Sequence, residues 1–219
     1  MKIYRKLFQP ESSVTEYIQA VIRKNNCRTG LDIGCGRFSN LTSVRPQIIS
    51  TGIDAFAASI EDAKHNNLHD NYILADVMQY DFSGQKFDVV IASEVIEHFD
   101  KWDALSLIKR MEQLATKLVI ITTPNGFLIQ GPEFNNPWQR HKSGWFVQDF
   151  LGLGYKVQGI FGPKFMRGYA NEIKWRGARV WTPVSQLIGR LIVPWPACHA
   201  ALLAIKDKEG VPAQLKKMT

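Results

Sequence analysis

Short apolar runs bounded by glycine, proline or aspartate alternate along the chain with segments whose apolar residues recur every three or four positions. The first kind of segment predicts buried strands, and the second predicts amphipathic helices. We expect strands at residues 28–33, 48–54, 72–74, 87–92, 118–122, 155–161 and 200–205. We expect helices at residues 11–26, 55–66, 101–116 and 145–151, and a short helix that ends before Pro46. A loop at 127–142 and an ambiguous stretch at 162–196 follow neither pattern.

Strands that alternate with helices at this spacing indicate an α/β fold with a parallel sheet of right-handed βαβ units. A length of 219 residues suits one such domain with a sizeable core, and we see no convincing linker. We therefore expect a single domain over residues 1–219, with an N-terminal helix region at 1–27. No apolar run reaches the length of a membrane span, because the nearest candidate, residues 187–205, is interrupted by Arg190 and two prolines.

The net charge of +7 is distributed unevenly. Residues 156–219 hold 11 Lys and Arg against 3 Asp and Glu, whereas residues 1–155 hold 16 against 17. Such a basic excess suits an anionic acceptor, nucleic acid or an anionic membrane surface, and it is equally compatible with a solvated basic face. The three cysteines form no ligand-like cluster and the first ten residues lack an apolar core, so we expect a reducing, cytoplasmic location.

The expected first strand ends in a glycine turn, Leu31-Asp32-Ile33-Gly34-Cys35-Gly36-Arg37-Phe38-Ser39-Asn40. Glycine tolerates positive φ and has no Cβ, so a ligand can lie against the backbone there. The dinucleotide-binding pattern needs a third glycine where this chain has Ser39, which disfavours a nicotinamide or flavin cofactor. Asp32, at the carboxyl end of a strand, suits an ammonium group better than a pyrophosphate.

Two further carboxylates follow expected strands. Asp54 stands 20 residues after Gly34, where a carboxylate can accept two hydrogen bonds from a ribose diol. Asp76 follows the third strand. Either residue could instead cap a turn or a helix. Because open α/β sheets bind ligands at the carboxyl ends of their strands, we expect both to lie beside the glycine turn.

The glycine turn closely resembles motif I of the class I S-adenosylmethionine-dependent methyltransferases. Ser93-Glu94-Val95-Ile96-Glu97-His98-Phe99 resembles motif IV of the branch that includes ubiquinone-type O-methyltransferases and other small-molecule methyltransferases. The likeness continues through residues 121–126 and 141–145 and covers about residues 28–160. It implies a doubly wound, mostly parallel, seven-stranded Rossmann-like sheet with an antiparallel last strand. It also implies that residues 127–199 hold acceptor-side loops and insertions.

The resemblance implies S-adenosylmethionine as cofactor, with Asp76 near the adenine amino group. The expected cofactor-binding residues are Asp32, Gly34, Cys35, Gly36, Asp54, Ala55, Asp76, Val77, Ser93 and Glu94. We expect His141 to be the general base for a hydroxyl acceptor, because a neutral imidazole can remove a proton near neutral pH. In related enzymes a histidine at the position of His98 packs near the acceptor, so we also place His98 among the catalytic candidates.

The expected reaction is in-line methyl transfer to a small-molecule, sugar-linked or lipid-linked acceptor, for which an anionic group and peripheral membrane contact are options. Glu94, Glu97 and His98, on one side of an expected helical turn, offer an alternative. With His141 they resemble the divalent metal site of small-RNA 2′-O-methyltransferases, although many relatives carry the same pattern without a metal. We expect no metal. An RNA 2′-O-methyltransferase and a non-catalytic cofactor-binding protein remain the alternatives.

Overall fold

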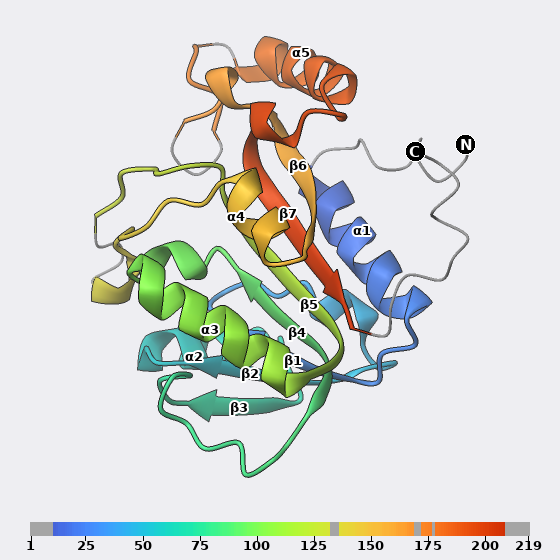
Figure 1. The fold of residues 1–219 in the computed structure, drawn as a ribbon, viewed down its shortest axis with the longest axis vertical. Coiled ribbons are helices and arrows are strands. Elements are labelled where there is room, and N and C mark those ends of the chain that lie inside the picture. The colour runs from blue at the N-terminus through green and yellow to red at the C-terminus, as the bar shows by residue number, and fades with distance from the viewer. Residues whose placement is uncertain (1–10, 132–135, 169–171, 177, 209–219) are drawn as a thin grey trace.

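The computed structural model describes residues 11–131, 136–168, 172–176 and 178–208, and its centre is a seven-stranded sheet (Figure 1). The strands are β1 (Thr29–Ile33), β2 (Ile49–Asp54), β3 (Asn71–Leu74), β4 (Phe87–Ser93), β5 (Ala115–Pro124), β6 (Lys156–Pro163) and β7 (His199–Asp207). The α-helices are α1 (Glu11–Lys24), α2 (Ala57–His65), α3 (Lys101–Leu114), α4 (Val147–Gly152) and α5 (Ala178–Leu191).

The strand order is β3-β2-β1-β4-β5-β7-β6. Neighbouring strands from β3 to β5 pair in parallel, whereas β7 is antiparallel to both β5 and β6. The prediction of a mostly parallel, seven-stranded sheet with an antiparallel last strand is confirmed. The strand order reverses between β1 and β4, which is the kind of position where open α/β sheets bind ligands at their carboxyl ends.

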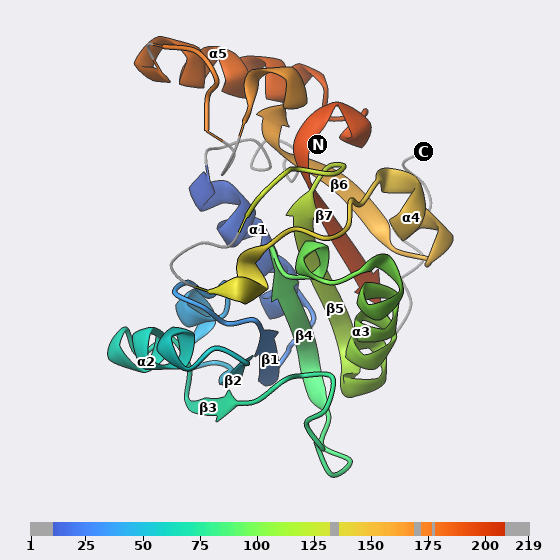
Figure 2. The same cartoon turned by 90° about the vertical axis from the view of Figure 1, so that its left-hand side faces the viewer.

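Helices cover both faces of the sheet (Figures 1 and 2). Because a strand is pleated, successive side chains of β4 point to opposite faces of the sheet and pack against different helices. Val90 packs in the cluster that contains Leu107 of α3 and Phe150 of α4, and Val89 packs with Ile18 of α1. These side chains are fully buried. Packing on both sides explains why β4 reads as one continuous apolar run.

Two segments differ from the sequence prediction. The expected short helix after the glycine turn is only a 3₁₀ turn at Thr42–Val44. The proline at 46 disfavours helical φ and ψ at the preceding residue, so too few residues remain for an α-helix. In the ambiguous stretch, by contrast, α5 forms a helix of 14 residues with Pro183 inside it. Proline disfavours the interior of a helix, so the sequence of this stretch did not predict α5.

Residues 1–10, and 132–135 of the expected loop at 127–142, lie outside the described residues. None of the helices among the described residues combines the length and the apolarity that a membrane span requires.

Candidate active site

The glycine turn follows the end of β1 and lies against the end of β2. Gly34 and Gly36 both have positive φ, 65° and 43°. A Cβ on Gly34 would lie 2.6 Å from a methyl carbon of Val95, so a larger residue would push the turn and the loop after β4 apart. The Gly34 and Gly36 amides donate to Ile53 O at 2.8 Å and to Asp54 Oδ2 at 3.3 Å. The end of β2 therefore fixes the conformation of the turn.

Asp54 and Asp76 both lie beside this turn, as expected. Asp54 Oδ1 also accepts the amide of Phe56 at 2.8 Å, and burial raises the pKa of its carboxyl group. Asp76 Oδ1 accepts the amide of Met78 at 2.8 Å, which is a turn-capping contact. Each carboxylate keeps acceptor capacity beyond these bonds, because an ionised carboxylate can accept about four.

These residues line a cavity that we call the glycine-turn cavity. Its lining includes seven of the expected cofactor-binding residues, namely Gly34, Gly36, Asp54, Ala55, Asp76, Val77 and Glu94. Lys142 and the half-exposed Trp138, both from the loop after β5, also line this cavity. Trp145, at the end of the same loop, is fully buried and packs with Phe150.

The structure does not place three of the expected residues in the lining. Asp32 is 3% exposed and accepts the Ser39 hydroxyl at 2.5 Å, while its Oδ2 lies 3.6 Å from His69 Nε2. Burial raises the pKa of Asp32 to about 7 and lowers that of His69 to about 4, so between these values both groups are neutral. The buried Cys35 packs against α2, and Ser93 Oγ accepts the Asn40 amide at 3.1 Å. All three side chains thus contact other residues of the protein and do not line the cavity.

A second cavity, of about 420 Å³, opens on the other side of Glu94, and we call it the basic cavity. Its lining includes the three basic residues Lys164, Arg167 and Lys174, together with His141 and Glu97. The two cavities share Glu94, His98 and Gln139 as lining residues. A molecule in one cavity can therefore approach a molecule in the other at this junction.

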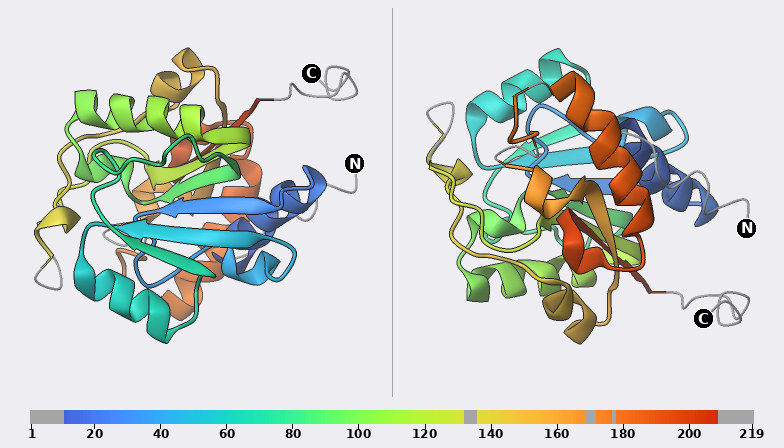
Figure 3. Two further views of the ribbon diagram at one scale, coloured as in Figure 1. Left: turned by 90° about the horizontal axis from the view of Figure 1, so that it is seen from below. Right: turned by 90° about the horizontal axis from the view of Figure 1, so that it is seen from above.

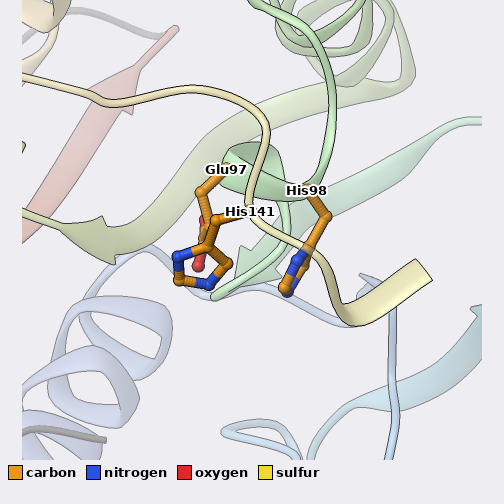
Figure 4. A group of neighbouring side chains, drawn as sticks. All are labelled: Glu97, His98 and His141. Carbon is orange, nitrogen blue, oxygen red and sulfur yellow. The ribbon is translucent and has the colours of Figure 1, made fainter. Parts of the chain in front are cut away.

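Glu97, His98 and His141 form a cluster in the wall of the basic cavity (Figure 4). One potential ligand atom from each lies within 4.8 Å of the others. The Nδ1 atoms of His98 and His141 face the carbonyl oxygens of Arg140 at 3.3 Å and Leu128 at 2.8 Å. A carbonyl only accepts, so a ring nitrogen that bonds to one carries the proton.

Burial shapes the charges of this cluster. Burial raises the pKa of Glu94 to about 7 and raises that of Glu97 well above its usual value, and the Glu94 charge adds to the effect at Glu97. Burial, together with His141, lowers the pKa of His98 to about 4. Glu97 Oε2 accepts the Thr123 hydroxyl at 2.9 Å, but its buried Oε1 has no hydrogen-bond partner. Neutral imidazoles can act as bases or as metal ligands.

The sequence predicted a helical turn that carries Glu94, Glu97 and His98. The structure has a 3₁₀ turn at Ile96–His98, and Glu94 precedes it with a φ of 54°. This irregular backbone turns Glu94 towards both cavities. The sequence did not identify Lys164, Arg167 and Lys174 as lining residues. The basic excess after residue 155 was their only signal, because their position depends on the path between β6 and β7.

Comparison with known proteins agrees with this geometry. A family described as a methyltransferase domain matches residues 31–129. The ubiquinone biosynthesis O-methyltransferase of Rickettsia conorii is 35% identical over 104 residues, which make up 45% of this chain and 32% of that protein. The matched part of this chain thus spans about a third of the length of that relative.

Solved structures share the fold across most of the chain. Magnesium protoporphyrin IX methyltransferase from Synechocystis, with bound S-adenosylmethionine, has a TM-score of 0.52 at 13% identity, covering 90% of this chain and 76% of that one. A small RNA methyltransferase has a TM-score of 0.58 at 20% identity, covering 91% of this chain and 25% of that one. The chain therefore contains a methyltransferase domain over residues 31–129, and it shares the fold of class I S-adenosylmethionine-dependent methyltransferases.

Proposed function

We propose that the chain transfers a methyl group to an acceptor bound in the basic cavity, by direct in-line displacement, with the cofactor in the glycine-turn cavity. The acceptor is a small molecule, or a sugar- or lipid-linked molecule, that carries an anionic group. The observation that carries this proposal is the junction of the two cavities at Glu94 and His98. In-line displacement needs the donor and the acceptor on opposite sides of one such opening.

The cofactor supplies a methyl group that its sulfonium makes electrophilic. The residues of the chain then have to align the acceptor and exclude water. In this proposal Asp54 holds the ribose hydroxyls, Asp76 faces the adenine, and Gly34 and Gly36 let the cofactor approach the backbone; all four residues line the cavity. Each of these assignments rests on the lining of the glycine-turn cavity.

His141 is our candidate for the general base. Its Nδ1 donates to Leu128 O at 2.8 Å, so in the neutral ring Nε2 is the nitrogen that carries the lone pair a general base needs. His98 shares the wall with its ring centroid 4.9 Å from that of His141, and its lowered pKa keeps it neutral at physiological pH. The two rings are therefore both placed to accept a proton from an acceptor at the junction.

The basic wall supports an anionic acceptor. Lys164, Arg167 and Lys174 line the same cavity as His141. Their charges would hold an anionic group away from the junction and leave the reacting atom near the histidines. Cationic walls of this kind also raise the local concentration of anionic ligands.

A screen with methyl-labelled cofactor tests this proposal. Hydroxylated acceptors should be compared in pairs with and without an anionic group, and we expect transfer to favour the anionic member of each pair. The double variant Lys164→Ala/Lys174→Ala should raise KM for that member, with kcat changed less. The matched control is Lys64→Ala/Lys109→Ala, which removes two exposed lysines outside both cavities. Equal KM values in the two double variants would contradict the anionic-acceptor proposal.

A second candidate function is RNA 2′-O-methyl transfer with a divalent metal ion. The specific observation in its favour is the cluster of Glu97, His98 and His141, in which Glu97 Oε1 is buried without a hydrogen-bond partner. Two imidazoles and a carboxylate suit several divalent metals. Histidines that donate their other nitrogen to a carbonyl, as His98 and His141 do, are typical of metal sites.

An RNA oligonucleotide belongs in the same screen, with and without EDTA. Transfer to RNA that EDTA abolishes and Mn²⁺ or Mg²⁺ restores would favour the second candidate over the first. Failure of every acceptor class, despite tight cofactor binding, would leave the non-catalytic alternative.

A further inference from the structure

Helix α5 stands apart from the layers that cover the sheet. It follows β6 and lies across the end of the molecule that carries the carboxyl ends of the parallel strands (Figures 2 and 3). Its contact with β6 is made by small residues. A Cβ on Gly162 would lie 2.8 Å from Ser185 Oγ, and one on Gly189 would lie 3.2 Å from Gly162 Cα. Ser185 and Gly189 are both buried, so they mark the face of α5 that meets the rest of the protein.

The opposite face of α5 is an exposed apolar stripe, formed by Val180, Leu187 and Leu191. These side chains are 65%, 58% and 67% exposed. Their spacings of seven and four residues place them in one row along the helix, about half a turn away from Ser185 and Gly189. Trp195, just beyond the helix, is 60% exposed. A helix with one anchored face and one exposed apolar face needs something to cover the second.

The segment that contains the stripe, between Glu172 and Asp207, carries charge of one sign. Residues 173–206 contain five Lys and Arg and no Asp or Glu. Arg179 and Arg190 are both exposed, and their spacing of 11 residues puts them on the same flank of the stripe. A symmetric contact between two copies of this face would bring arginines against arginines, with no acidic residue from 173–206 to offset them.

We propose that the stripe on α5 docks on an anionic membrane surface. An amphipathic helix that has an apolar face, flanking arginines and a nearby tryptophan is suited to lie in the headgroup region of a bilayer. Anionic lipids complement the positive charge, and apolar side chains reach the acyl boundary. This is peripheral docking, since none of the helices among the described residues is suited to span the bilayer.

The docking helix is connected to the basic cavity. Arg167 Nε donates to Ser185 Oγ at 3.2 Å, and Arg167 lines the cavity together with Lys164 and Lys174. The connection of docking to catalysis rests on the proposed function. With α5 on the membrane, the basic cavity lies close to the headgroup layer. Among the proposed acceptor classes, this favours a lipid-linked acceptor whose anionic headgroup enters the cavity while its chains stay in the bilayer.

Sedimentation of the full chain with vesicles tests the docking without cofactor or acceptor. We expect binding to phosphatidylcholine vesicles that contain phosphatidylglycerol, weaker binding to phosphatidylcholine alone, and weakening by salt. Leu187→Glu/Leu191→Glu should lower the affinity for anionic vesicles by roughly 10- to 100-fold, because charges replace two exposed leucines that docking would bury in the bilayer. Arg179→Gln should lower it by roughly 5-fold. The control Leu151→Glu, at a leucine of α4 that is 55% exposed, should bind like the wild type.

Unchanged cofactor affinity in the leucine variant would show that it is folded. No binding to anionic vesicles at low ionic strength would overturn the proposal, as would equal binding by the wild type and the leucine variant. A concentration-dependent dimer that this variant abolishes would assign the stripe to a second copy instead. These results are independent of methyl transfer to a water-soluble acceptor. Failure of docking and failure of the proposed function are therefore separate outcomes.

Discussion

Replacing Asp54 with alanine should weaken S-adenosylmethionine binding through a contact that the structure defines. Two of the acceptor positions of the carboxylate are used by the amides of Gly36 at 3.3 Å and Phe56 at 2.8 Å. About two remain, which is what a ribose diol needs. Hydrogen bonds to a charged group contribute about 1.5–3 kcal/mol each when well shielded, and partial exposure of Asp54 reduces this.

We therefore expect Asp54→Ala to cost about 1–3 kcal/mol of binding free energy, which is about a 5- to 150-fold increase in Kd. Titration calorimetry with S-adenosylmethionine measures this directly. Asp54→Asn keeps one carbonyl oxygen and should fall between the wild type and the alanine variant. The amides of Gly36 and Phe56 also lose their acceptor, so the melting temperature of each variant has to be measured alongside.

Asp81→Ala is the matched control. Asp81 Oδ1 accepts the amide of Ser83 at 2.7 Å, a turn contact of the same i to i+2 form as the bond between Asp54 and Phe56, but Asp81 does not line the glycine-turn cavity. Asp81→Ala should leave Kd unchanged. An unchanged Kd in a folded Asp54→Ala protein would refute the reasoning and remove Asp54 from the cofactor site.

Three further predictions follow from the site. His141→Ala should lower kcat by roughly 10²- to 10⁴-fold and leave the cofactor Kd unchanged; near-normal kcat at saturating acceptor would end the general-base assignment. Dialysis against EDTA should leave methyl transfer intact in our primary account, and loss that Mn²⁺ restores would make Glu97, His98 and His141 ligands. Burial raises the pKa of Asp32 from 3.8 to about 7. The folded protein therefore binds the Asp32 proton more tightly than the unfolded chain, and the free energy of unfolding falls as pH rises from about 4 towards 7. In denaturant titrations between pH 4 and 7, this fall should be about 1.4 kcal/mol per pH unit smaller in Asp32→Asn than in the wild type. The same dependence of unfolding free energy on pH in both proteins would contradict this.

Much of the fold could be predicted because its determinants are local. The apolar run in β4 and the helical spacing in α3 depend only on neighbouring residues, and both elements lie within two residues of their expected bounds. The glycine turn, Asp54 and Asp76 were predictable for a related reason. Parallel strands bring their carboxyl ends to one edge, so residues that follow different strands meet there.

The remaining features depend on tertiary structure. Nothing local to Asp32 shows that its side chain would pair with Ser39 under the turn instead of lining the cavity. The path between β6 and β7 decides that Lys164 and Lys174 line the same cavity as His141. Contact with β6 stabilises α5 despite Pro183, a case in which packing overrides local propensity.

The central claim is that the cofactor and the acceptor meet at the opening between the two cavities. A crystal structure of the chain with S-adenosylhomocysteine tests it most directly. We predict that the ribose hydroxyls lie within hydrogen-bond distance of the Asp54 carboxylate, about 3 Å, and that the sulfur lies at the junction beside Glu94 and His98, directed towards the basic cavity. A nucleoside bound away from the glycine turn, or a sulfur directed away from His141, would contradict the account.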